Sequence, residues 1–377
     1  MERKNAWAAY AGDDGRVEAF AKAYCDFINN GKTERECVAY GEKLAKAHGF
    51  EDLNAAVRSG RKLEAGARVY VNWMGKSFML FVLGEKPLEE GMNILGAHID
   101  SPRIDVKQNP LYEDTDLAYL DTHYYGGIKK YQWVAIPLAL HGVIVRKTGE
   151  KVIINIGEDE NDPVFCISDL LVHLAQEQMT KNAKEVVEGE ALNLIVGGRP
   201  LEGEEKDAVK ANVLKLLADK YGVEEEDFLS AELEIVPAGK ARDMGFDRSM
   251  ILAYGHDDRV CAYPSMMAVL DYEGTPEYTL CCIVTDKEEI GSVGATGMAS
   301  HYLENTVAEL YACTADYCEL AVRRCLRNSR MLSSDVSAGY DPNFASAFEK
   351  KNSAFLGRGI CFNKFTGSRG KSGSNDA

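Results

Sequence analysis

Residues 92–100 read MNILGAHID, an apolar run that ends in a histidine followed two positions later by an aspartate. An apolar run without polar alternation is typical of a strand buried on both faces of a sheet. The pattern therefore predicts a buried strand over residues 92–97, with His98 at its carboxyl end. Because open α/β sheets build their crevices at the carboxyl ends of strands, His98 is a candidate functional residue.

Two later apolar runs also end in acidic residues. Residues 278–285 lead into DKEE at 286–289, and residues 331–334 lead into Asp335. Of two adjacent glutamates after a buried strand, one can bind a metal while the other accepts the proton of a water molecule. The alternatives are a charged loop for the glutamate pair and a turn or helix cap for Asp335.

A fourth acidic site, Asp257 with Asp258, lies in a turn after the apolar run 250–254. Two carboxylates this close favour a cation beside them, and the alternative is a solvated turn with Arg259 as counter-ion. For His98 the alternative is a core histidine with satisfied hydrogen bonds, although Asp100 suits an acceptor that orients a ligating ring. The four sites together favour a metal centre more than any one of them does.

The pattern of predicted strands and helices between residues 104 and 249 differs from that of the flanking sequence. Strand-like stretches at 134–145 and 152–156 are followed by a helical stretch near 169–180 and a charged helix around 204–221. Buried strands followed by helices then return, which indicates an α/β fold. We predict a catalytic domain of residues 1–104 and 250–377, interrupted by a second domain of residues 105–249. Helical spacing from residue 17 and a capping box of Thr33 with Glu36 predict a helical N-terminal region.

The composition excludes several classes of function. The chain of 377 residues has 59 acidic against 43 basic side chains, a net charge of -16, which disfavours nucleic acid and anionic membranes as partners. Neither a signal peptide nor a membrane span is expected. Ten cysteines without a CxxC pair indicate reduced, mostly structural thiols and a cytoplasmic protein. The GxSxG and HExxH motifs of other hydrolases are absent.

The segments GAHIDSP at 96–102, DKEEIGS at 286–292 and SDV at 334–336, in this order, resemble the M18 metallopeptidases, the family of aspartyl aminopeptidase and aminopeptidase I. The acidic turn at Asp257 falls where that family has its bridging aspartate. The resemblance implies a zinc-peptidase-like mixed sheet flanked by helices, with an inserted, mainly β dimerisation domain. It also implies an aminopeptidase that acts on peptides, and a homo-oligomer in which dimers assemble into a tetrahedral dodecamer.

Carried over residue by residue, the resemblance implies two divalent metal ions, usually zinc, with cobalt or manganese as alternatives. His98 and Glu289 would bind the first metal, Asp257 would bridge both, and Asp335 would bind the second. Asp258 would aim Asp257, unless a shift of one residue exchanges the two.

The same comparison assigns the remaining roles. Glu288 would be the general base and Asp100 would orient His98. His173 matches a family histidine that reaches the substrate site of a neighbouring subunit, although on a helix it could equally pack in the core.

The sequence departs from the family pattern in two places. Members that prefer acidic N-terminal residues have a lysine where this chain has Asn363, and on a strand the adjacent Lys364 would face the opposite side, so a neutral or hydrophobic N-terminal residue is an open alternative. The family's final histidine ligand follows a glycine-rich stretch near the C-terminus, and this chain stops at Ala377 before reaching it, without a closing strand or helix signal. We therefore expect a partial sequence.

Two other functions stay open at this point. Another two-metal hydrolase, such as a deacylase, could use the same scaffold. An inactive assembly or cargo-binding scaffold could retain the fold, although such a protein would not need these buried carboxylates.

Overall fold

The computed structural model describes residues 4–368 and 371–374, and the chain divides into two compact units. One unit consists of Met1–Tyr24 and Asp335–Ala377, and the other of Cys25–Ser334. Each is described by itself. Because this division does not separate residues 105–249 from the rest, the inserted domain stays a prediction.

The smaller unit contains few regular elements. Helix α1 (Ala6–Ala9) precedes α2 (Asp14–Asn30), which continues into the larger unit. The ring of Tyr340 packs on Phe348 and Phe355, with centroids 5.6 and 5.4 Å apart. Near the C-terminus, where the sequence shows no strand signal, β15 (Phe365–Ser368) and β16 (Lys371–Ser374) form an antiparallel hairpin. Ala377 lies outside the described residues.

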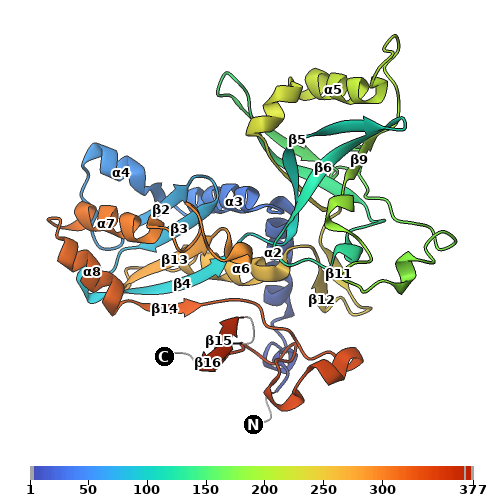
Figure 1. Ribbon diagram of the computed structural model, residues 1–377. Coiled ribbons are helices and arrows are strands. Elements are labelled where there is room, and N and C mark those ends of the chain that lie inside the picture. The colour runs from blue at the N-terminus through green and yellow to red at the C-terminus, as the bar shows by residue number, and fades with distance from the viewer. Residues whose placement is uncertain (1–3, 369–370, 375–377) are drawn as a thin grey trace. The chain divides into compact units, whose positions relative to one another are not determined.

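A six-stranded mixed sheet carries the predicted strands of the larger unit, in the order β1-β2-β3-β13-β4-β14 (Figure 1). Strand β4 (Met92–His98) runs parallel to both of its neighbours, β13 (Thr279–Thr285) and β14 (Arg330–Ser333). The buried strand predicted over 92–97 is therefore confirmed. The remaining strands are β1 (Glu51–Asp52), β2 (Arg68–Trp73) and β3 (Ser77–Val82).

Helices cover both faces of this sheet, because successive side chains of its central strands, which point to opposite faces, are buried on both. On one face, Met79, Phe81 and Ile283 pack in a cluster with α4 (Leu53–Ser59), α7 (Tyr302–Thr314) and α8 (Glu319–Asn328). On the other, Phe78 lies beside α3 (Glu34–Ala47) and α6 (His256–Leu270). The predicted capping box is confirmed: the Thr33 hydroxyl accepts from the Glu36 amide, and the Glu36 carboxylate accepts from the Thr33 amide.

A second, antiparallel sheet of six strands follows β4 directly in sequence, in the order β8-β7-β10-β5-β6-β9. Its apolar core includes Ile104, Leu140 and Ile235. The charged helix predicted around 204–221 is α5 (Ala208–Tyr221). The strands are β5 (Arg103–Asp114), β6 (Leu117–Tyr125), β7 (Leu138–Val145), β8 (Lys151–Ile156), β9 (Leu194–Gly197) and β10 (Glu232–Pro237).

The helix predicted near 169–180 is wrong. The segment forms consecutive turns and ends in a short 3-10 helix, Gln178–Thr180. Its apolar side chains, including Leu171 and Leu174, are exposed, so no tertiary surface stabilises an amphipathic helix here. The Asp169 carboxylate instead accepts from the Leu170 amide and the Gln178 side chain, which favours a turn.

The other elements are short. They are the hairpin of β11 (Arg242–Met244) and β12 (Met250–Leu252), and 3-10 helices at Leu88–Glu90, Lys130–Gln132, Gly189–Ala191, Glu225–Ser230, Glu288–Ile290, Pro342–Ala347 and Lys350–Asn352. Within the described part of the chain, none of the helices has the length and apolar character needed to traverse a lipid bilayer.

Candidate metal centre

The site begins at the carboxyl end of β4. His98 is its last residue and is 3% exposed. The ring Nδ1 lies 3.0 Å from the backbone oxygen of Asp100 and 3.3 Å from its Oδ1, and these contacts fix the ring plane. The opposite nitrogen, Nε2, faces Asp257 Oδ1 at 3.2 Å. A histidine held on one nitrogen by an oxygen acceptor presents the other nitrogen for ligation.

The acidic turn lies at the start of α6, where Asp257 and Asp258 have non-helical backbone angles. The peptide bond between them is cis. The Asp257 side chain is 50% exposed and faces the His98 ring, whereas Asp258 is fully buried and its Oδ2 accepts from the His98 amide at 3.4 Å. The two carboxylates thus have different surroundings, and Asp257 is the one beside Nε2.

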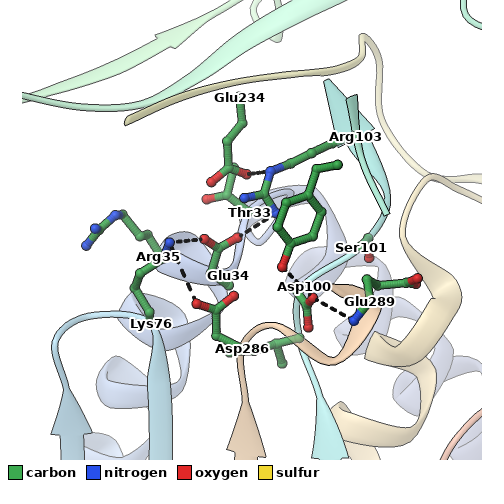
Figure 2. A network of polar contacts seen from close by, with 12 residues as sticks. Thr33, Glu34, Arg35, Lys76, Asp100, Ser101, Arg103, Glu234, Asp286 and Glu289 are labelled. Carbon is green, nitrogen blue, oxygen red and sulfur yellow. Dashed lines mark hydrogen bonds and ion pairs between the residues drawn. The ribbon is translucent and has the colours of Figure 1, made fainter. Parts of the chain in front are cut away.

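The pairing of strands β13 and β4 places Glu288 and Glu289 beside the His98 ring. Strand β13 lies beside β4 with Thr285 opposite His98, so the loop after β13 emerges next to the imidazole. Glu288 Oε2 lies 3.8 Å from His98 Nε2, and its side chain is 48% exposed. The amides of Glu288 and Glu289 donate to Asp100 Oδ1 and Oδ2, both at 3.1 Å (Figure 2 shows Asp100 beside Glu289). Asp100 therefore holds the glutamate loop as well as the histidine.

Donor atoms of His98, Asp257 and Glu289 lie within 4.8 Å of one another. This set of one imidazole nitrogen and two carboxylate oxygens fits zinc. Burial and the charge of Asp257 raise the pKa of Glu289 to about 7, and although burial opposes it, Asp100 and Asp257 raise the pKa of His98 to about 11. The negative charges of the neighbouring carboxylates contribute to both shifts.

The roles of two further predicted site residues, Asp335 and His173, are not tested by the geometry described above. Asp335 opens the second segment of the smaller unit, where its Oδ1 accepts from the Val336 amide at 2.6 Å. It directly follows Ser334, whose amide donates to the Gly96 carbonyl beside the end of β4. His173 is exposed on a turn and does not belong to the group of described residues around His98. The roles of Asp335 and His173 stay predictions.

Sequence reasoning missed a buried ionic network beneath the site. Figure 2 shows Glu34 between Lys76 and Arg103. The Lys76 ammonium lies 2.8 Å from the Glu34 carboxylate and 3.7 Å from that of Asp286, the residue that directly follows β13. Arg103 also contacts Glu234 at 3.1 Å. A signal was present, because Lys76 directly precedes the apolar run SFMLFV and Glu234 interrupts an apolar strand.

Known proteins resemble this chain along its whole length. A family model described as aminopeptidase I zinc metalloprotease (M18) matches residues 27–377. A probable M18 family aminopeptidase 1 from Clostridium acetobutylicum is 57% identical over 380 residues, which cover 100% of this chain and 81% of that protein. Two solved structures each cover 100% of this chain, which spans 82% of theirs: an M18 aminopeptidase from Thermotoga maritima (41% identity, TM-score 0.93) and aminopeptidase I from Clostridium acetobutylicum (54% identity, TM-score 0.90).

Proposed function

The chain belongs to the M18 family of zinc metallo-aminopeptidases, and from that premise we propose that Glu288 is the general base with which it releases N-terminal residues from peptides. The observation that carries the proposal is the convergence of His98, Asp257 and Glu289 within 4.8 Å, with the Glu288 carboxylate 3.8 Å from the same imidazole nitrogen. A base must lie within reach of the water whose proton it accepts, and Glu288 is the more exposed of the two glutamates.

The proposed ligand set follows from this geometry and from the resemblance. His98 and Glu289 would hold the first of two zinc ions, and Asp257, with its two carboxylate oxygens, would be the ligand shared with the second. Asp335 is the proposed ligand of the second ion. Cobalt or manganese could replace zinc on the same oxygen and nitrogen donors.

The residues of the chain then have distinct tasks. Bound zinc supplies Lewis acidity, which polarises a substrate carbonyl and lowers the pKa of water. Glu288 accepts the proton of the attacking water and returns it to the leaving amine. Asp100 holds the His98 ring and the backbone amides of Glu288 and Glu289 in fixed positions. The distance between the base Glu288 and the metal ligands therefore stays constant while Glu288 accepts and returns the proton.

Removing the metal is expected to abolish activity reversibly. Dialysis against a chelator should stop release of N-terminal residues from Leu-, Glu- and Asp-peptides, and added zinc should restore it. Because zinc binds the folded state, its addition should also raise the thermal midpoint, with stabilisation of about 2.7 kcal/mol at roughly a hundred times Kd.

The same assay separates the alternatives. Folded, zinc-loaded protein that releases no amino acid would contradict the peptidase proposal and favour the scaffold. Release from acylated amino acids alone would favour a deacylase. The substrate panel also decides between acidic and neutral N-terminal residues.

Asn363 and Lys364 precede β15 in an irregular segment, so the strand alternation we assumed for them was wrong.

We also propose that the protein is a homo-oligomer, with dimers that assemble further. The support is an apolar run on the exposed turns before Thr180: Leu170, Leu171, Val172 and Leu174 are 52–72% exposed. Contiguous exposed apolar side chains mark association sites. Sedimentation of the wild type should show an oligomer that Leu171→Asp weakens, whereas a wild-type monomer would contradict the proposal. A cytoplasmic location stays a prediction from the sequence, which has ten cysteines and no CxxC pair.

A further inference from the structure

The carboxyl end of strand β6, in the second sheet, lies beside the candidate metal centre. Tyr125, its last residue, is 8% exposed, and its hydroxyl donates to Asp100 Oδ2 at 2.8 Å. Burial and the Asp100 charge raise the pKa of Tyr125, so the hydroxyl keeps the proton that it donates. Asp100 thus has hydrogen-bond partners in three segments: Tyr125 in the second sheet, the amides of the Glu288–Glu289 loop, and the His98 imidazole at the end of β4.

The position of Tyr125 is set by its strand partner. In the antiparallel pairing of β5 with β6, Tyr125 lies directly opposite Arg103, and the Arg103 guanidinium lies 3.9 Å from the centroid of the Tyr125 ring. Arg103 is itself fixed by ion pairs with Asp105, Glu34 and Glu234. Cross-strand partners share one face of a sheet, so this pair directs the phenol toward Asp100, three residues before Arg103.

The next residue makes a second contact with the site. Gly126 has φ +73°, and a Cβ placed on it would lie 3.3 Å from the Glu289 Cβ and 3.5 Å from Glu289 Oε2. The backbone at the end of β6 therefore lies directly against the proposed ligand Glu289. Tyr125, the last residue of β6, and Gly126, which follows it, therefore lie against Asp100 and Glu289 respectively.

We propose that Tyr125 is a positioning residue, whose hydroxyl fixes the Asp100 carboxylate and through it both the His98 ring and the Glu288–Glu289 loop. This inference rests on the proposed function of Glu288 and His98. Partners that orient ligands in this way affect metal affinity and turnover when they are removed, although they touch neither metal nor substrate. Tyr125 would thereby make the second sheet part of the catalytic apparatus.

Tyr125→Phe removes only the hydroxyl and keeps the ring on Arg103, so its thermal midpoint should stay close to that of the wild type. We expect kcat to fall about 10-fold to 100-fold with little change in KM, and zinc to be lost at lower chelator concentrations. The matched control is Tyr124→Phe, because Tyr124 is 41% exposed, lies on the opposite face of β6 and stacks on His123. The control should leave kcat and zinc retention unchanged.

A double-mutant cycle with Asp100→Asn separates positioning from a purely structural effect. If Tyr125 acts through Asp100, adding Tyr125→Phe to Asp100→Asn should cost far less than it costs alone. Losses that add in full, or a Tyr125→Phe variant that matches the control in kcat and zinc retention, would overturn the inference. Failure of the proposed function is distinguishable, since it would show as activity that survives Glu288→Gln, while zinc retention would still report on Tyr125.

Discussion

Replacing Glu288 with glutamine should lower kcat by about 10²-fold to 10⁴-fold, the range that a general base contributes. The amide has nearly the shape of the carboxylate but cannot accept the proton of the attacking water. Because His98, Asp257 and Glu289 are untouched, zinc content should stay that of the wild type. Steady-state kinetics on a Leu-peptide, together with metal analysis of the same preparation, measures both.

Glu273→Gln is the matched control for this variant. Glu273 is an exposed glutamate on the turn after α6, and the same loss of one negative charge there should leave kcat unchanged. A zinc-loaded Glu288→Gln enzyme with wild-type kcat would assign the base to another group. Loss of zinc in step with kcat would instead identify Glu288 as a ligand, and the roles of the two adjacent glutamates would be exchanged.

Replacing Lys76 with methionine should have the largest effect on stability. The Lys76 side chain is 8% exposed and compensates Glu34 and Asp286, both of which are 0% exposed. Removing one partner of a buried ionic group leaves uncompensated charge and costs about 3–5 kcal/mol. We expect the thermal midpoint to fall by about 5–15 °C, and calorimetry of the chelated and zinc-loaded forms measures the shift without dependence on catalysis.

Two comparisons test the physical cause of this loss. Lys215→Met breaks the exposed pair with Asp219 and should cost under about 0.5 kcal/mol. Glu34→Gln added to Lys76→Met should recover part of the stability, because it removes one of the charges left alone. No recovery, together with equal losses for Lys76→Met and Lys215→Met, would mean that the buried network does not stabilise the fold.

The network also predicts how stability depends on pH. Although burial opposes it, Arg103 and Lys76 lower the pKa of Glu34 below its ordinary value. A carboxyl whose pKa is lower in the folded state stabilises that state above the pKa it has when unfolded, about 4.3, and this contribution is lost as the pH falls below it. The stability gap between wild type and Lys76→Met should therefore narrow in acid.

The sequence by itself determined the strand that ends at His98, the strand that ends before the two glutamates, the capping box at Thr33 and the family. These features are local: each depends on the apolar pattern or the capping residues of one short segment, and the motif order is read along the chain. The helix predicted near residue 169 failed because an apolar pattern becomes a helix only where a surface buries it, and here the apolar side chains stay exposed.

Only the tertiary structure decided which groups hold the site together. Asp100 looked like a partner for His98 alone, yet it also accepts from the amides of Glu288 and Glu289 and from Tyr125. Lys76 and Glu34 are 42 positions apart by their numbers and meet as a buried ion pair. Such contacts depend on which strands become neighbours in the fold. That arrangement is determined by the packing of the whole core, and no local pattern in the sequence reveals it.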